Sequence, residues 1–444
     1  MFNKSECTRC GICFHKCPEM KLPLDTAKEE IYALINGQNG DYVLWQCASC
    51  FSCNAYCPND CHPYQLILSS WNRLYNERGA PPTDKLVCPT VDGNLWQMLH
   101  VITPDEEKQQ LRKWQEPIED RDLRNKPILL VGNLAHIMPF ILDESPILDN
   151  FNLYDALDQW ECGGYLYQLG YLDVVKQVGM QCKKDFKKWS EDVVIIPVLD
   201  AVHHMLMEVY PEELGIEINQ KITDFHDFLL NMLLNGQIKL GEGSDMPITT
   251  VTIHDNCFSK ASSKYWDTAR KIITECGFEI KEMEHIRNDS RCCGFGAGCS
   301  WETNSQIVFD IMQTSKEKLM EAKRTSADAL VTYCGGCYFI LWAANELFDT
   351  GLKIYHTFEL VRMASGETLN SEQTLQKERA WDLIAIFTYN LIKGLFSSNF
   401  KIHDVEGIPQ PKRYIFLKMI RWFFKFNCMR NFYRRVFRWM LRRH

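Results

Sequence analysis

The feature that most constrains this chain is a four-cysteine pattern that occurs twice within its first 57 residues. Each copy has three cysteines separated by two residues, a fourth after three more, and then a proline. The residues are Cys7, Cys10, Cys13, Cys17 with Pro18, and Cys47, Cys50, Cys53, Cys57 with Pro58. A [4Fe–4S] cube needs three thiolates from one tight loop and a fourth from elsewhere. Zinc, which favours paired C-x-x-C units, and disulfides are the alternatives. The pattern predicts two cubane clusters.

The fourth cysteine of each copy is expected to serve the other cube, as in two-cluster ferredoxins. The predicted ligand sets are Cys7, Cys10, Cys13 and Cys57 for one cube, and Cys47, Cys50, Cys53 and Cys17 for the other. Between the motifs, the capping-box sequence from Thr26 to Glu29 and the stop residue Gly37 predict a helix. The sequence therefore predicts an α-helical two-cluster ferredoxin domain.

Length and composition indicate a protein of two or three domains with large cores, since 46% of the 444 residues are hydrophobic. Residues 1–30 show no charged-then-apolar signal peptide. Twenty cysteines without such a signal favour metal binding over disulfides, and we expect a cytoplasmic location. No stretch approaches 18 uninterrupted apolar residues, so no membrane-spanning helix is expected.

Charge divides the chain unevenly. Residues 412–444 hold eleven Lys or Arg and no Asp or Glu, whereas the preceding residues hold 38 Lys or Arg against 57 Asp or Glu. Basic residues at helical spacing, Lys418, Arg421 and Lys425 and then Arg430, Arg434, Arg438 and Arg442, predict two basic amphipathic segments with a bend near Asn427 and Asn431. We expect this tail to bind an anionic membrane surface. Docking on an acidic partner is the alternative, and nucleic acid is not expected.

From Lys126 onward, short β-rich runs alternate with helical patterns, which is typical of an α/β region. An internal repeat divides it into two lobes that we expect to be related by a pseudo-twofold axis. The predicted strands are Ile128–Val131, Val193–Ile196, Thr249–His254 and Ala329–Tyr333. The predicted helices include Lys264–Glu275 and Gln306–Ala322. A polar linker is predicted over Ser365–Arg379, and an apolar docking helix over Trp381–Phe396.

A second cysteine constellation lies in the second lobe. Cys257 is followed after 34 residues by Cys292-Cys293-Gly294 and, after 40 more, by Cys334-Gly-Gly-Cys337. Each group falls where a strand should end and a helix begin, which is the usual place for sites in open α/β sheets. Two adjacent cysteines suit an unusual metal geometry. A structural zinc and buried free thiols are the alternatives.

This constellation resembles the CCG motif of the iron–sulfur oxidoreductase family that includes the D subunit of heterodisulfide reductase. The whole layout also resembles the third subunit of anaerobic glycerol-3-phosphate dehydrogenase and the Hdr-like subunit of the membrane complex linked to sulfite reduction. The resemblance implies that one noncubane [4Fe–4S] cluster is held by Cys257, Cys292, Cys293, Cys334 and Cys337. His254, in a sequence similar to the family's His-Asp-Pro-Cys, is a candidate proton donor, with support of the cluster as the alternative.

The first lobe departs from the family pattern. Asn133 and Glu161 stand where cysteines are expected, Leu199 and Val202 replace the final pair, and Cys162 alone is retained. One thiolate does not hold such a cluster, so we expect this lobe to be metal-free.

The resemblance implies an oxidoreductase subunit that passes electrons through the two cubes to the noncubane cluster, where a disulfide-type substrate is reduced. The alternative is an electron-transfer subunit that links a flavoprotein dehydrogenase to membrane quinone. No G-x-G-x-x-G sequence is present, so a flavin is expected in a partner. The expected partners are a flavoprotein or other redox subunit and a membrane cytochrome b, with the chain peripheral on the inner face of the cell membrane.

The expected domain order has six parts. These are the ferredoxin-type domain (1–80), a linker (81–125), the degenerate CCG lobe without a cluster (126–245), the CCG lobe with the noncubane cluster (246–365), a linker and helix (366–411) and the membrane-associating tail (412–444).

Overall fold

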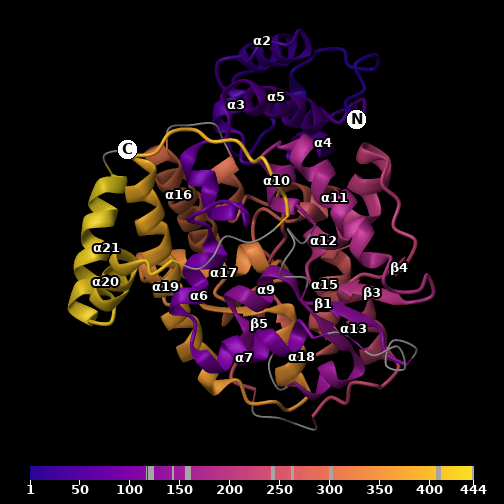
Figure 1. The fold of residues 1–444 in the computed structure, drawn as a ribbon, viewed down its shortest axis with the longest axis vertical. Helices are drawn as coiled ribbons and strands as arrows, with labels where there is room; N and C mark the ends of the chain where they lie inside the picture. Colours follow the sequence, from indigo (N-terminus) through magenta and orange to yellow (C-terminus); the bar gives the residue numbers. More distant parts are fainter. Residues whose placement is uncertain are drawn as a thin grey trace.

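The computed structural model describes residues 1–116, 118, 125–142, 145–155, 162–241, 246–261, 265–299, 304–406 and 412–442. A small helical domain formed by the N-terminal residues lies against one end of a larger α/β body (Figure 1). Its helices are α1 (Ile12–His15), α2 (Leu24–Ile35), α3 (Val43–Gln46), α4 (Ser52–Ala55) and α5 (Pro63–Arg78). This domain is ferredoxin-like, as predicted.

The helix predicted between the cysteine motifs is confirmed as α2, but its predicted capping box is wrong. The helix begins at Leu24 after Pro23, so Thr26 lies inside it rather than at its N-cap. Proline with φ −55° already has the backbone angle that a helix start requires. The chain turns away at Gly37, which has φ +76°. Glu30, buried on α2, accepts hydrogen bonds from the backbone N–H groups of residues 41, 42 and 43 and so fixes the approach to the second cysteine loop.

Two four-stranded parallel sheets with the same kind of strand order form the α/β body. The first runs β2 (Asn152–Tyr154), β1 (Ile128–Leu130), β3 (Val194–Pro197), β4 (Lys221–Ile222), and the second runs β6 (Glu279–Ile280), β5 (Thr250–His254), β7 (Ala329–Thr332), β8 (Lys353–His356). All four predicted strands are confirmed, and they are the two central strands of each sheet. The outer strands were missed because most are short and half exposed. The matching strand orders agree with two related lobes, while the pseudo-twofold axis stays a prediction.

Helices cover both sheets and carry most of the core. The predicted helices are confirmed as α15 (Tyr265–Glu275) and α16 (Asn304–Arg324), although Lys264 lies outside the described residues. The other α-helices of the body are α6 (Leu95–Ile102), α7 (Asp105–Trp114), α9 (Gly132–Ile137), α10 (Gly164–Gln168), α11 (Leu172–Phe186), α12 (Asp200–His204), α13 (Phe225–Leu234), α14 (Phe258–Ala261), α17 (Gly335–Phe348) and α18 (Thr357–Ala364).

Short 3-10 and π turns connect these helices and strands. The 3-10 turns are η1 (Pro82–Val87), η2 (Pro139–Ile141), η3 (Pro146–Asn150), η5 (Arg287–Asp289) and η6 (Phe295–Cys299), and η4 (Met205–Leu214) is a π-helix.

Helix α19 (Asn370–Gly394) contradicts part of the predicted polar linker, because Ser365–Arg379 is helical from Asn370 onward. Two polar residues of this segment are not solvated as a linker requires. Gln376 is buried and donates to Tyr338 Oη over 2.7 Å, and Arg379 is buried and pairs with Glu107 at 2.6 Å. Side chains that look like linker residues in the sequence therefore anchor a long helix to the body.

The C-terminal tail forms two helices, α20 (Ile415–Phe423) and α21 (Asn427–Leu441), on the outer side of α19 (Figure 1). The predicted bend occurs between them, ahead of Asn427, whereas Asn431 lies within α21. Leu417, Phe424 and Phe437 are buried against the body. No helix in the described part of the chain is long and apolar enough to cross a membrane.

Candidate metal centre

The cysteines of the second lobe meet at one edge of its sheet. His254, the last residue of β5, is paired in register with Thr332, the last residue of β7. Cys257 follows three residues after His254, and Cys334 follows two residues after Thr332. Because the carboxyl ends of parallel strands share one edge, these two thiols are brought together. Cys337 lies in the first turn of α17, and Cys292 and Cys293 lie in the loop before η6.

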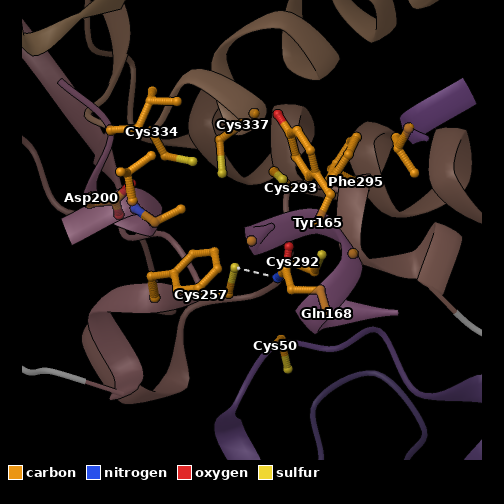
Figure 2. Close-up of a pocket in the computed structure, with 18 of the residues that line it drawn as sticks. Cys50, Tyr165, Gln168, Asp200, Cys257, Cys292, Cys293, Phe295, Cys334 and Cys337 are labelled. Atoms are coloured by element: carbon orange, nitrogen blue, oxygen red, sulfur yellow. Dashed lines mark hydrogen bonds between the residues drawn. The ribbon is translucent and has the colours of Figure 1, made fainter. Parts of the chain in front are cut away.

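All five of these thiols line one cavity (Figure 2). Ligand atoms of His254, Cys293 and Cys337 lie within 4.8 Å of one another. Hydrogen bonding by the Cys292 and Cys337 thiols holds the pKa of Cys293 well below its usual range. The structure thus brings together every residue of the predicted noncubane set.

Gly294 explains why a glycine follows the two cysteines. It has φ +107°, and a Cβ added there would lie 2.1 Å from Ser315 Oγ and 2.4 Å from the backbone oxygen of Ile311. Ser315 also donates a hydrogen bond to the carbonyl of Cys293. The backbone of the cysteine pair is therefore packed directly onto α16, which leaves no room for a side chain.

The donor set fits a thiolate-bound metal cluster. Burial raises the pKa of Cys257, and hydrogen bonding by Cys293 together with burial raises that of Cys292, so a bound cation would favour the thiolate form of both residues. Both ring nitrogens of His254 are buried and have no hydrogen-bond partner among the described residues. Soft thiolates in such a group suit iron–sulfur clusters or other thiophilic metals. The position of His254 against Cys293 and Cys337 suits support of a cluster, and its role as an acid stays a prediction.

The first lobe has the same register with one thiol of the family pattern, Cys162, which is buried and lines the same cavity as the five thiols. Leu130 of β1 pairs with Pro197 of β3, so Asn133 and Leu199 occupy the sequence positions that correspond to Cys257 and Cys334. The Asn133 side chain and Glu161 lie outside what the structure describes. Leu199 and Val202 are buried among apolar neighbours. The expectation that this lobe is metal-free stays a prediction.

Two residues of this lobe that face the cavity were missed by the sequence analysis, Gln168 and Asp200. Asp200 is buried, accepts a hydrogen bond from Asn256 Nδ2, and has its pKa raised by burial to about 7. It stands inside the replaced C-x-x-C pair, so alignment of the repeats could have marked it. Gln168, the last residue of α10, belongs to no sequence motif that would have marked it.

The ferredoxin cysteines form two neighbourhoods that differ in exposure. Cys7, Cys10 and Cys57 are partly exposed, whereas Cys47, Cys50 and Cys53 are buried. Burial, then nearby Cys57 and Cys10, raise the pKa of Cys13. Burial and Cys50 raise the pKa of Cys17 to about 12. These neighbours are compatible with the crossed ligand sets, which stay a prediction.

The second cysteine loop of the ferredoxin domain reaches the cavity of the second lobe. Cys50 lies in the wall of that cavity, and its sulfur is turned away from the five thiols (Figure 2). Polar contacts hold the junction: the backbone N–H of Cys292 donates to Glu19 Oε1 over 3.0 Å, and the buried Lys260 donates to Ser52 Oγ over 2.7 Å. The two cysteine systems are therefore parts of one continuous site.

Comparison with known protein families agrees with this geometry. The model of the cysteine-rich CCG domain matches residues 251–341, which include all five thiols, and the model of the 4Fe-4S dicluster domain matches residues 1–58. These two segments fit the CCG-domain family. The five thiols Cys257, Cys292, Cys293, Cys334 and Cys337 are accordingly called the CCG cysteines.

The relatives of this chain include proteins named as reductases and oxidoreductases. The D subunit of the dihydromethanophenazine:CoB–CoM heterodisulfide reductase of Methanosarcina acetivorans is 23% identical over 47% of this chain and 50% of that protein. The EtfAB:quinone oxidoreductase of Syntrophomonas wolfei is 20% identical over 72% of this chain and 46% of that protein. The probable iron-sulfur-binding oxidoreductase FadF of Bacillus subtilis is 20% identical over 74% and 47%. The chain spans about half the length of the curated relatives it matches, and these similarities support a redox role generally.

Proposed function

We propose that this chain is an electron-transferring iron–sulfur oxidoreductase subunit. Its terminal site would be the cavity lined by the CCG cysteines, called the CCG cavity. The eight ferredoxin cysteines would hold two cubane clusters and the CCG cysteines one noncubane cluster. The observation that carries the proposal is the placement of Cys50 on the wall of the CCG cavity. A cysteine loop that forms part of the wall of a second thiol site gives electrons a short route between them.

The order of the thiol sites suggests a direction of approach for the redox partner. The first loop is partly exposed at Cys7 and Cys10, the second is buried, and the CCG cysteines are mostly buried beneath the second. A flavoprotein or other redox protein would dock at the first loop, because the protein covers the other two sites.

The proposed substrate is a disulfide or a compound of similar two-electron chemistry. Iron–sulfur clusters supply single electrons, and a disulfide takes up two electrons and two protons as its S–S bond breaks to give two thiols. Asp200 stands in the cavity wall with a pKa of about 7, so it could hold a proton for a departing thiolate at neutral pH. The rings of Tyr165 and Phe295, whose centroids are 5.1 Å apart, form an aromatic part of the cavity wall.

The second candidate function is relay of electrons to a membrane carrier without chemistry at the CCG site. It is favoured by the coverage of the relatives, since the EtfAB:quinone oxidoreductase and FadF match more of this chain than the heterodisulfide reductase does. The two functions differ in one measurement. Addition of a disulfide or thiol substrate should change the EPR signal of a cluster that performs the chemistry, and an unchanged signal would favour the relay.

We also propose that the tail holds the protein on an anionic membrane surface. Among its exposed side chains are Trp422 (55% exposed) and Phe432 (61%), together with Ile415, Phe416, Met419, Phe423, Phe426 and Trp439. Lys418, Lys425 and Arg435 are exposed alongside them, and residues 412–444 contain no acidic residue. Exposed aromatic residues flanked by cations are typical of helices that lie in the lipid headgroup region.

The contacts of the tail require a revision of the predicted membrane-facing stripe. Arg421 pairs with Asp382, Arg434 pairs with Glu346, and Arg438 donates to the carbonyl of Leu347. These arginines attach the helices to the body, so the aromatic face is left for the lipid. Flotation with liposomes of varied anionic content tests the proposal. Trp422→Ser with Phe426→Ser should lose binding, whereas equal flotation of this variant and the original chain would exclude lipid contact through this face.

A further inference from the structure

Gln168 lies at the point where the three parts of the site meet. It is the last residue of α10 in the first lobe, it is 3% exposed, and it faces Cys257 of the second lobe (Figure 2). The second cysteine loop of the ferredoxin domain packs on its other side through Ser49. A residue of the lobe without the CCG cysteines thus contacts both thiol systems.

The amide of Gln168 makes hydrogen bonds to both systems. Its Nε2 donates to Cys257 Sγ over 3.4 Å and to the backbone oxygen of Ser49 over 3.2 Å. Ser49 Oγ in turn donates to the backbone oxygen of Gln168 over 2.9 Å, and Ser49 N donates to Cys47 Sγ over 3.4 Å. Gln168 and Ser49 therefore form a continuous hydrogen-bonded bridge from a ferredoxin thiol to a CCG thiol.

The backbone on both sides of this bridge is held by close packing. Gly170, two residues after Gln168, has φ +77°, and a Cβ there would lie 2.5 Å from the Cβ of Trp71 on α5. Ser49 itself has φ +50°, and its hydroxyl is shared with Tyr64 Oη at 2.6 Å. The end of α10 is therefore pressed onto the ferredoxin domain, so the Gln168 amide has little freedom to turn away.

We propose that Gln168 is a positioning residue that aligns the second ferredoxin loop with the CCG cysteines and raises the reduction potential of the cluster they bind. The inference rests on the proposed function, because it requires a cluster at Cys257. An N–H group that donates to a ligand sulfur stabilises the additional negative charge of the reduced state, and such hydrogen bonds are among the factors that set iron–sulfur potentials.

The test is an EPR-monitored redox titration of the full chain carrying Gln168→Met. Methionine keeps the length of the side chain and removes the N–H donor. We expect the midpoint potential of the CCG signal to become more negative, with a smaller change in the ferredoxin signals. The CCG signal is assigned by its loss in Cys334→Ser. The matched control is Gln220→Met, since Gln220 is buried in the same lobe and donates to the carbonyls of Phe186 and Trp189, away from the thiols.

Gln168→Asn keeps the inference testable if the methionine variant is unstable. The asparagine side chain is one methylene shorter, so its amide is too far from Cys257 to donate to the sulfur. The same negative shift of the midpoint potential is expected. A CCG signal with unchanged potential in both variants, beside an intact signal in the original chain, would overturn the role of Gln168 alone. If the original chain has no CCG signal and only the iron of two cubes, the proposed function and this inference fail together.

Discussion

At the scale of single residues, the site depends on side chains that the cysteine spacing does not reveal. Gly294 allows the cysteine pair to lie on α16, and Glu30 fixes the approach to the second ferredoxin loop. The family-like sequence around His254 predicts that this residue lies beside the expected cluster. In the structure its ring nitrogen lies near the thiols of Cys293 and Cys337. Two predictions belong to this scale.

Cys17→Ser should damage the cube held by the second ferredoxin loop and spare the cube of its own loop. The reason is the crossed ligand scheme, in which Cys17 joins Cys47, Cys50 and Cys53. EPR and Mössbauer spectra of the reduced variant would separate the two cubes. Cys57→Ser is the matched control and should have the opposite effect. Loss confined to the first-loop cube in Cys17→Ser would show that the sets do not cross.

Asp84→Asn should stabilise the protein increasingly, relative to the original chain, as the pH rises from about 4 to 7. Burial raises the pKa of Asp84 from 3.8 to about 7, and Tyr171 Oη donates to its carboxyl group. Because the folded pKa is above the unfolded one, the stability that the acid contributes is complete below pH 3.8 and is lost as the pH rises through 7. A difference of one unit between the folded and unfolded pKa corresponds to about 1.4 kcal/mol.

The measurement for Asp84 is the melting temperature of the variant minus that of the original chain at several pH values. Asp92→Asn provides a control of opposite sign, since a hydrogen bond from Lys412 lowers the pKa of Asp92. A difference for Asp84→Asn that does not vary with pH would mean that the carboxyl group titrates normally.

At the scale of secondary-structure elements, the long helix α19 shows that tertiary contacts can make a helix of a polar segment that the sequence predicts to be a linker. Its first half resembles a linker in composition, yet Gln376 and Arg379 find buried partners on other elements. The tail follows the same principle. Amphipathic spacing predicts its helices, but the partners Glu346 and Asp382 decide which face of each helix is turned toward the body.

Arg434→Ala should destabilise the docking of α21, whereas Arg435→Ala should have little effect. Arg434 is mostly buried, donates to the carboxylate and the backbone oxygen of Glu346, and lies 5.2 Å from the Trp381 ring. Loss of hydrogen bonds to a charged group costs about 1.5–3 kcal/mol. Arg435 is exposed, and substitution of an exposed side chain usually changes the free energy of unfolding by less than about 0.5 kcal/mol.

Limited proteolysis between α20 and α21 and thermal unfolding would detect the released helix. Faster cleavage near Phe426 in Arg434→Ala, with the rate for Arg435→Ala unchanged, is the expected result. Equal rates for the two variants would contradict the assignment of Arg434 as an anchor.

At the scale of the whole molecule, the two lobes and the ferredoxin domain enclose one site. We expect about twelve irons per chain after anaerobic purification, as for three [4Fe–4S] units. Cys334→Ser combined with Cys337→Ser should remove about four of them. Cys162→Ser should leave the iron content unchanged, because Cys162 lines the same cavity but is not one of the five expected ligands. A loss of about four irons in Cys162→Ser would contradict the proposed ligand set, and zinc in place of iron would contradict the proposed cofactors.

The sequence by itself determined the local features of this protein. Cysteine spacing identified the thiol sets, since ligands of one loop are held a few residues apart. Hydrophobic runs located the central strands, which are buried on both faces and so leave a continuous apolar signal.

Only the tertiary structure decided how these parts meet. The parallel register of β5 and β7 brings Cys257 and Cys334 to the same edge of the sheet, and chain folding brings Cys50, Gln168 and Asp200 to the same cavity. The contact between Ser49 and Gln168 spans 119 residues along the chain. No local pattern encodes such a contact, because it arises from the packing of separate domains. The same kind of packing turns tail arginines, which amphipathic spacing alone would direct to a membrane, toward acidic partners on the body.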